Sequence, residues 1–197
     1  MNMNENKYYD FDYWFKKSDR HLGEDNYGVK YYAYEIFKSI LPLLEIPTEG
    51  YIVVLGSHNC VSLELLCQVY GRERCVGFDL FNPTNNDRVR IKDCNLLSDA
   101  DDLPIAFCHN DLGSFPTTPR LKINGQEWAT KNMIEGGILL SRNNLNSAKY
   151  KSEDFMRARG FDNIMFQQLR EKHPDNFVNL RERDIEGHMF SIKNELV

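Results

Sequence analysis

The sequence lacks long apolar runs. No hydrophobic stretch approaches the roughly 20 residues that span a bilayer, and the opening MNMNENKYYD has neither the cationic start nor the apolar run of a secretory signal. We therefore expect a soluble, cytoplasmic protein with no membrane partner. With 197 residues, 42% of them hydrophobic and 27% charged, the chain has the size and the apolar content of one globular domain.

The sequence also lacks blocks of positive charge. Its 24 Lys and Arg residues are outnumbered by 29 Asp and Glu residues, which gives a net charge of -5. Non-specific binding to nucleic acids requires concentrated positive charge, because it depends on the displacement of counterions from phosphates. We therefore expect no nucleic-acid partner. The alternation of Arg88, Arg90 and Lys92 is interpreted as the solvated face of a strand rather than as a basic groove.

Cysteine pairs at metal-binding or disulfide spacing are absent. The five cysteines contain no CxxC pair and are odd in number, so the sequence suggests neither a disulfide framework nor a zinc site. Most of them have apolar neighbours in the sequence, so we expect small core residues in a reducing compartment. The cysteines are Cys60, Cys67, Cys75, Cys94 and Cys108.

Aromatic residues, in contrast, are concentrated near the start of the chain. Residues 8–15 read YYDFDYWF, and six of these eight side chains are aromatic. Such a segment is costly to leave in water. We expect residues 1–29 to form an arm that packs on the domain as an additional element, or that acts as a lid and contributes to an acceptor pocket.

From residue 30 onward, short apolar runs alternate with helical patterns, which is typical of a parallel sheet built by right-handed crossovers. Predicted strands cover residues 51–55, 75–78, 89–91, 105–108 and 138–140. Helices are predicted over residues 29–44, between Cys60 and Gly71, and around Trp128. The all-apolar YIVVL of residues 51–55 indicates a central strand covered on both faces.

The C-terminal third has a different pattern. Residues 152–173 have mostly helical spacing, interrupted near Gly160. Residues 176–180 and 188–192 are predicted strands, and two strands so close in sequence must pair antiparallel. The expected fold class is thus α/β, with a doubly wound and mostly parallel sheet that ends in an antiparallel C-terminal hairpin.

A ligand site is expected at the carboxyl ends of the parallel strands, where open sheets of this kind bind ligands. Gly56 follows the first predicted strand and allows a tight turn, and Ser57 or Asn59 can cap the next helix. Asp79 ends the second strand, 23 residues after Gly56, where a carboxylate can accept from both hydroxyls of a ribose. The combination predicts a nucleoside-containing ligand. The dinucleotide fingerprint GxGxxG is absent, which argues against NAD.

These motifs resemble the class I S-adenosylmethionine-dependent methyltransferases over residues 30–194. The resemblance is carried by VVLGSHNCVSLELL, CVGFDLFNP, FCHNDLGSF, WATKNMIEGGILLSRNN and the closing HMFSIK. It is closest to small-molecule O-methyltransferases of the macrocin and catechol type. It implies a Rossmann-like methyltransferase domain over residues 30–197, S-adenosylmethionine as the cofactor, and a small-molecule methyl acceptor that receives the methyl group at an oxygen.

The resemblance also implies roles for individual residues. Asp79 would hold the ribose hydroxyls, and Asp111 and His109 are the candidate catalytic bases that would remove a proton from a hydroxyl acceptor. For His109 the alternative is an ordinary hydrogen bond to a loop. The remaining implied cofactor-binding residues are Gly56, Ser57 and His58 at the methionine part, Asp93 and Cys94 at the adenine ring, and Asn110 after the fourth strand.

The chain departs from the family's pattern at two places. Asn59 and Cys60 occupy the region where the family's loop has further glycines. Metal-dependent members hold magnesium between carboxylates, whereas this chain offers Asp111 with Asn143 and Asn144. The low charge of that set makes it a poor site for a hard cation, so the use of magnesium stays open and is not predicted.

Two alternatives remain open. The depleted glycine loop also suits a non-catalytic relative that serves as a binding or scaffold domain. A nicotinamide-dependent reductase is the other alternative, and the predicted antiparallel hairpin argues against it, because the sheet of such a reductase would be parallel to its end.

Overall fold

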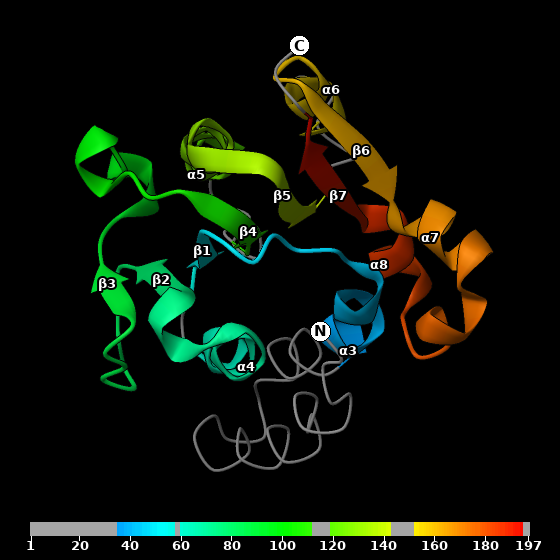
Figure 1. Cartoon of the computed structure of the whole chain (residues 1–197), viewed down its shortest axis with the longest axis horizontal. Helices are drawn as coiled ribbons and strands as arrows, with labels where there is room; N and C mark the ends of the chain where they lie inside the picture. Colours follow the sequence, from blue (N-terminus) through cyan, green and yellow to red (C-terminus); the bar gives the residue numbers. More distant parts are fainter. Residues whose placement is uncertain (1–34, 58–59, 112–118, 143–151, 195–197) are drawn as a thin grey trace.

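The computed structural model describes residues 35–57, 60–111, 119–142 and 152–194. These residues form one seven-stranded sheet with helices on both sides (Figure 1). The aromatic segment at residues 8–15 lies outside the described residues, so its packing or lid role stays a prediction. No helix in the described ranges combines the length and the hydrophobicity that a membrane span requires.

The sheet has the strand order β3-β2-β1-β4-β5-β7-β6. Neighbouring strands from β3 to β5 pair parallel, and β7 pairs antiparallel with both β5 and β6. The α/β class and the mostly parallel sheet are therefore confirmed. The strands are β1 (Tyr51–Leu55), β2 (Cys75–Asp79), β3 (Val89–Ile91), β4 (Ile105–Asn110), β5 (Met133–Arg142), β6 (Phe161–Met165) and β7 (His188–Lys193).

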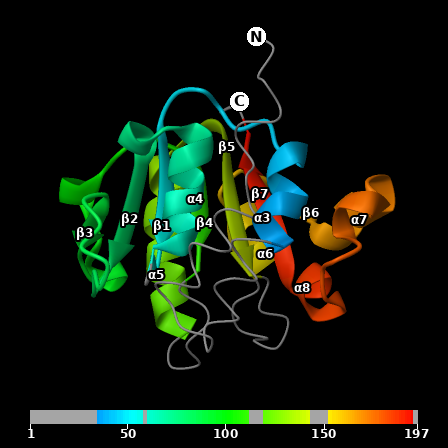
Figure 2. The same cartoon turned by 90° about the horizontal axis from the view of Figure 1, so that it is seen from below.

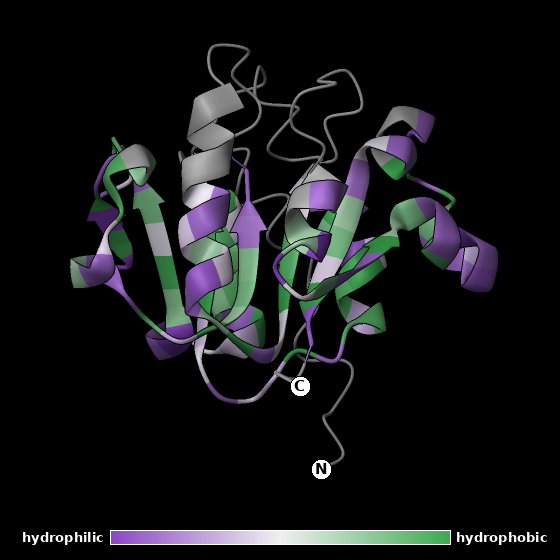
Figure 3. Ribbon diagram, turned by 90° about the horizontal axis from the view of Figure 1, so that it is seen from above, coloured by the Kyte–Doolittle hydropathy of each residue, from purple (hydrophilic) through white to green (hydrophobic). Residues whose placement is uncertain are grey.

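The central strand β1 is buried on both faces, as its apolar run predicts. Ile52 and Val54 belong to one hydrophobic cluster, whereas Val53 and Leu55 belong to the other, because successive side chains of a strand point to opposite faces. Each cluster is the core between the sheet and one layer of helices. Hydrophobic residues concentrate on the strands in Figure 3, and hydrophilic residues on the outer turns of the helices.

One layer of helices contains α3 (Phe37–Ile40), α4 (Val61–Tyr70), α7 (Phe166–Lys172) and α8 (Glu182–Gly187), whose apolar side chains share a cluster. The other layer contains α5 (Pro119–Asn132) and α6 (Ser152–Arg157), which contribute Trp128 and Met156 to the opposite cluster. Figure 2 shows α3 and α4 in front of the central strands, with α5 on the other side of them. Helices therefore cover both faces of the sheet.

The N-terminal half matches the predicted elements closely. Helix α4 ends at Gly71, whose positive φ of 93° suits a glycine at a helix C-terminus. The described part of the helix predicted over residues 29–44 consists of α3 and the short 3-10 helix η2 (Leu41–Leu43). All five cysteines are buried with free thiols, as expected of core residues.

The basic residues around β3 contact other residues of the protein, and Arg90 is at the same time exposed to solvent. The Arg88 guanidinium donates to the Cys75 and Glu73 carbonyls, at 2.8 and 3.1 Å. Arg90 lies over the ring of Phe78, 5.6 Å from its centroid. Lys92 donates to the Asp101 carboxylate. These side chains therefore brace the edge of the sheet, and they do not form an open basic groove.

The C-terminal third differs from its prediction in two places. The helical pattern over residues 152–173 is interrupted by the strand β6, which the sequence did not reveal. Residues 176–180 form no strand, because the 3-10 helix η6 (Pro174–Phe177) and a turn cover them. The predicted hairpin is therefore wrong. The antiparallel strand β7 is correct, but it pairs with β5 and β6.

Candidate functional site

The candidate site lies where the order of the strands reverses, between the carboxyl ends of β1 and β4. The chain runs outward from β1 through β2 to β3 and then returns to β4 on the other side of β1. The two strand ends are joined directly, because the Asp111 amide donates to the Leu55 carbonyl at 3.0 Å. Ligands bind at this point in open parallel sheets.

Gly56 forms the turn after β1 and lies beside the end of β2. Its φ of 80° is in the left-handed region, which a glycine adopts without strain. Its amide and that of Ser57 both donate to the Phe78 carbonyl, at 2.9 and 3.3 Å. Since Asp79 is the next residue after Phe78, the turn at Gly56 lies beside the part of the backbone that carries Asp79.

The amides of this turn are already used within the protein. Besides Gly56 and Ser57, Cys60 donates its amide to the Ser57 carbonyl at 2.6 Å. The Gly56, Ser57 and Cys60 amides are therefore not available as hydrogen-bond donors to a ligand at this turn. Asn59 and His58, between these residues, lie outside the described part of the chain, so their predicted roles are untested.

Ser57 does not cap α4, so that prediction is wrong. The N-cap is Cys60, in the left-handed conformation with φ 65°, and it forms no side-chain cap hydrogen bond. The Ser57 side chain is buried instead under the start of α4. Its hydroxyl has no hydrogen-bond partner and lies 2.9 Å from the point where a Cβ at Gly77 would be. The hydroxyl therefore faces β2.

Asp79 lies half-buried at the carboxyl edge of β2. Its Oδ1 accepts the Phe81 amide at 3.2 Å, and its carbonyl accepts the Lys92 amide at 2.8 Å. The next two side chains are apolar and open to solvent, since Leu80 is 56% and Phe81 68% exposed. A carboxylate beside exposed apolar surface can bind a polar group and a flat apolar ring of one ligand at the same time.

Cys94 lies beneath the same turn, on the face of the sheet that α5 covers. It belongs to the 3-10 helix η4 (Cys94–Leu96) and is 4% exposed. Its thiol donates to the Phe78 carbonyl at 3.7 Å. Burial raises the pKa of this thiol to about 12, although a hydrogen bond from the Gly56 backbone partly opposes the rise. The thiol is therefore neutral and supports the turn. Asp93 directly precedes η4, is half-buried, and its carbonyl accepts the Leu96 amide at 2.8 Å.

The last candidates come from the end of β4. Asn110 is buried and pairs with Leu55, at the edge of the sheet. His109 is 2% exposed and packs edge-on against the Phe37 ring, with 5.0 Å between the ring centroids. Asp111 follows the strand and is half-buried. Asp111 is thus nearer the edge than His109.

The structure therefore brings Gly56, Asp79, Cys94, Asn110 and Asp111 to one edge of the sheet. The sequence predicted this grouping from the strand ends. It did not reveal the need for glycine at Gly77, because only the packing of Ser57 and Leu63 shows it. The exposed apolar pair after Asp79 was also missed, although the DLF of residues 79–81 carries a readable signal.

Metal ligands do not gather in the described part of the chain. Within it, no three His, Cys, Asp or Glu side chains lie close enough together to hold a metal ion. Asn143 and Asn144 lie outside the described residues.

Of the two ends of the S-adenosylmethionine that the resemblance implies, the adenosine end fits the residues at this edge better than the methionine end does. Asp79 offers a carboxylate for ribose hydroxyls, next to the apolar Leu80 and Phe81. Where the methionine end would lie, the Ser57 hydroxyl points to Gly77, and the Gly56, Ser57 and Cys60 amides are occupied. Asn110 and Asp111 lie at the end of β4, at the same edge of the sheet.

Comparison with known proteins assigns the chain to no group. No protein-family model matches the sequence, and no curated protein matches it at a significant level.

Proposed function

We propose that the protein is an S-adenosylmethionine-dependent methyltransferase that acts on an oxygen of a small molecule. The single observation that carries the proposal is the contact between two strand ends: the Gly56 and Ser57 amides bind the carbonyl that precedes Asp79. A tight turn beside a carboxylate at the reversal point of a parallel sheet is the arrangement that binds a ribose. The sequence resemblance then favours S-adenosylmethionine over other nucleosides.

The end of the sheet supports this proposal over a nicotinamide-dependent reductase. The resemblance implies a parallel sheet with an antiparallel finish, and β7 is antiparallel to both of its neighbours. The missing GxGxxG fingerprint points the same way, because a pyrophosphate needs the close backbone approach that its second glycine allows.

In the proposed mechanism Asp79 binds the ribose, and the neutral Cys94 thiol holds the turn from below. Bound S-adenosylmethionine supplies an activated methyl group, so the protein must align the acceptor and take up its proton. Asp111 is the first candidate base, because it lies at the edge where the acceptor would meet the cofactor. His109 is the second, and its burial against Phe37 leaves it less accessible.

Calorimetric titration with S-adenosylmethionine and S-adenosylhomocysteine tests the binding. Replacement of Asp79 by Asn should weaken binding about tenfold, since a hydrogen bond to a charged group is worth roughly 1.5–3 kcal/mol. Asp175→Asn, at an exposed aspartate of η6, is the matched control and should change nothing. Absence of binding by the wild-type protein at millimolar concentrations would overturn the proposal.

A second candidate function is a non-catalytic binding or scaffold domain of the same fold. The specific observation in its favour is that the Gly56, Ser57 and Cys60 amides are all bound within the protein. The two candidates differ in turnover. If a copurifying small molecule, identified by mass spectrometry, is methylated by the wild-type protein, Asp111→Asn should lower the rate and leave cofactor affinity unchanged.

A further inference from the structure

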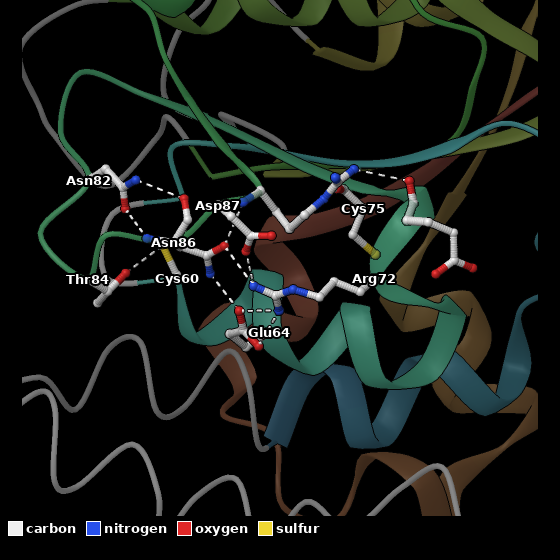
Figure 4. Close-up of polar contacts among 10 residues, drawn as sticks. Cys60, Glu64, Arg72, Cys75, Asn82, Thr84, Asn86 and Asp87 are labelled. Carbon is white, nitrogen blue, oxygen red and sulfur yellow. Dashed lines mark hydrogen bonds and ion pairs between the residues drawn. The ribbon is translucent and has the colours of Figure 1, made fainter.

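A cluster of polar side chains lies beside the candidate site but outside it. We name it the Arg72 cluster, and Figure 4 shows it between α4 and the loop that joins β2 to β3. Its members are Glu64 of α4, Arg72 of the 3-10 helix η3 (Arg72–Arg74), and Asn86 and Asp87 of the loop. Arg72 joins all the others: its guanidinium donates to Glu64 at 2.8 and 3.0 Å, to Asn86 at 3.4 Å, and to Asp87.

Asn86 is the buried centre of the cluster. It is 8% exposed, and its side-chain amide donates to Glu64 Oε1 at 2.6 Å. Its Oδ1 accepts the Arg88 amide at 2.9 Å. Its backbone exchanges two hydrogen bonds with the Asn82 side chain, at 2.8 and 2.9 Å. These hydrogen bonds of Asn86 therefore connect residues within the loop and join the loop to α4.

The loop has little apolar burial to hold it. Among residues 80–88, all of which the structure describes, Asn86 alone is buried, and the two large apolar side chains, Leu80 and Phe81, are exposed. A loop without apolar burial opens easily unless polar contacts fix it. An exposed ion pair by itself contributes little to stability. Arg72, however, is bonded to the buried Asn86 side chain and to two carboxylates.

The same loop reaches the candidate site at its start and in its middle. It starts at Asp79, the proposed ribose ligand. In its middle, Thr84 donates to the Cys60 thiol at 3.3 Å, and Cys60 is the N-cap of α4 that closes the turn after Gly56. A shift of the loop would therefore displace Asp79 and the start of α4 relative to each other.

We propose that the Arg72 cluster positions the nucleoside site: it clamps the β2–β3 loop to α4 and so fixes the Asp79 carboxylate beside the Gly56 turn. The inference rests on the proposed function, because it concerns the affinity of that site for an adenosine-bearing ligand. Arg72 touches no ligand in this proposal, so it is a positioning residue and acts through Asp79.

A double-mutant cycle with S-adenosylhomocysteine as the calorimetric probe tests the coupling. Arg72→Met should weaken binding about tenfold in the wild-type background and less than about twofold in the Asp79→Asn background, since coupled residues are non-additive. Arg72→Lys, which retains the charge without the planar fork, should give an intermediate loss. Arg170→Met removes a similar surface pair with Glu182, at 2.7 Å, and is the matched control without effect.

Hydrogen exchange of the free protein gives a second readout that needs no ligand. Arg72→Met should accelerate exchange of the amides in residues 80–88 and in the first turn of α4, and leave β4 and β5 unchanged. Equal losses of affinity in both backgrounds, or unchanged exchange in the loop, would overturn the inference while the proposed function stands. If the wild-type protein fails to bind the probe, the proposed function itself is overturned, and the inference with it.

Discussion

The contact between Ser57 and Gly77 shows how closely the turn after β1 packs on β2. A Cβ at Gly77 would lie 2.8 Å from the Leu63 side chain and 2.9 Å from the Ser57 Cβ, which is closer than carbon atoms approach in folded proteins. Glycine is required here for space, and it lets the turn descend onto the strand. The position of the Gly56 turn relative to Asp79 therefore depends on the absence of a side chain two residues before Asp79.

Substitution of Gly77 by Ala should accordingly destabilise the protein by about 1–3 kcal/mol, the usual cost of overpacking a core. The measurement is denaturant unfolding. Gly187→Ala is the matched control, because a Cβ at Gly187 meets nothing within 4 Å. Equal stability of the two variants would show that the turn can move away from β2 without cost.

At this scale, sequence reasoning predicted positions better than contacts. The pairing of Gly56 with Asp79 follows from strand ends and spacing, and both residues lie where that reasoning put them. The capping role of Ser57 was wrong because a capping preference is local, whereas the hydroxyl is buried by tertiary packing under α4. Occupation of the turn's amides by Phe78 also depends on a residue distant in sequence.

At the scale of elements, one aromatic side chain joins α7 to the end of the sheet. The Phe166 ring is stacked on His188 with 5.3 Å between centroids, and it lies 5.0 Å from Phe190 and 5.9 Å from Phe177. Phe166 is fully buried. It thus connects α7, η6 and β7.

Removal of this ring should be costly. Phe166→Ala is expected to destabilise the protein by about 3–5 kcal/mol, whereas Phe166→Leu should cost less because it retains much of the volume. Val178→Ala, at a side chain that is 73% exposed, should stay within about 0.5 kcal/mol of wild type. Unfolding by urea measures all three. A loss below about 1 kcal/mol for Phe166→Ala would contradict the role given to the ring.

A second element, the 3-10 helix η5 (Asp99–Asp101), is attached by charge. Burial disfavours the ionised form of Asp101, but hydrogen bonds from Lys92 and Ser98 outweigh it, and the net effect is a pKa below the ordinary value. A lowered carboxyl pKa stabilises the folded state at pH values above the unfolded value of about 3.9, and this stabilisation is lost as the pH falls through the lower folded value.

Lys92→Met should therefore reduce stability near neutral pH and flatten its decline on the acid side of about pH 4. Urea unfolding at a series of pH values measures this dependence. Lys172→Met, at an exposed lysine of α7, should leave the acid-side slope unchanged. If the stability of Lys92→Met and of the wild type fell equally steeply with pH, the interaction of Lys92 with Asp101 would not contribute to acid sensitivity.

The elements that the sequence missed are those with weak patterns. In β6 only Phe161 is fully buried, since among the described strands it pairs with β7 alone and lies at the edge of the sheet. Half-exposed edge strands do not show clean alternation. Phe177 and Leu180, three residues apart, are buried from η6 and its following turn. A spacing of three residues is typical of a helical turn, and the prediction of a strand over residues 176–180 did not take it into account.

At the scale of the whole molecule, the sheet is completed by a strand distant from its neighbour in sequence. β7 lies between β5 and β6, so these two strands are connected through it. Its buried residues Met189 and Phe190 point to opposite faces of the sheet and belong to the two different hydrophobic clusters. Both layers of the core thus depend on one strand near the end of the sequence.

Removal of residues 188–197 should expose the edges of β5 and β6 and leave both clusters open. We expect the shortened protein to lose cooperative thermal unfolding and to accumulate in the insoluble fraction, because unpaired apolar edges associate. Removal of residues 195–197, beyond β7, is the control for length and should leave solubility unchanged. A soluble shortened protein with a sharp thermal transition would contradict this account.

The place of β7 also has a consequence for synthesis. A ribosome releases β1 to β5 first, and these strands can associate as soon as they emerge. β6 follows but finds its partner only when β7 leaves the exit tunnel. Until then the edge of β5 that pairs with β7 stays open in the nascent chain.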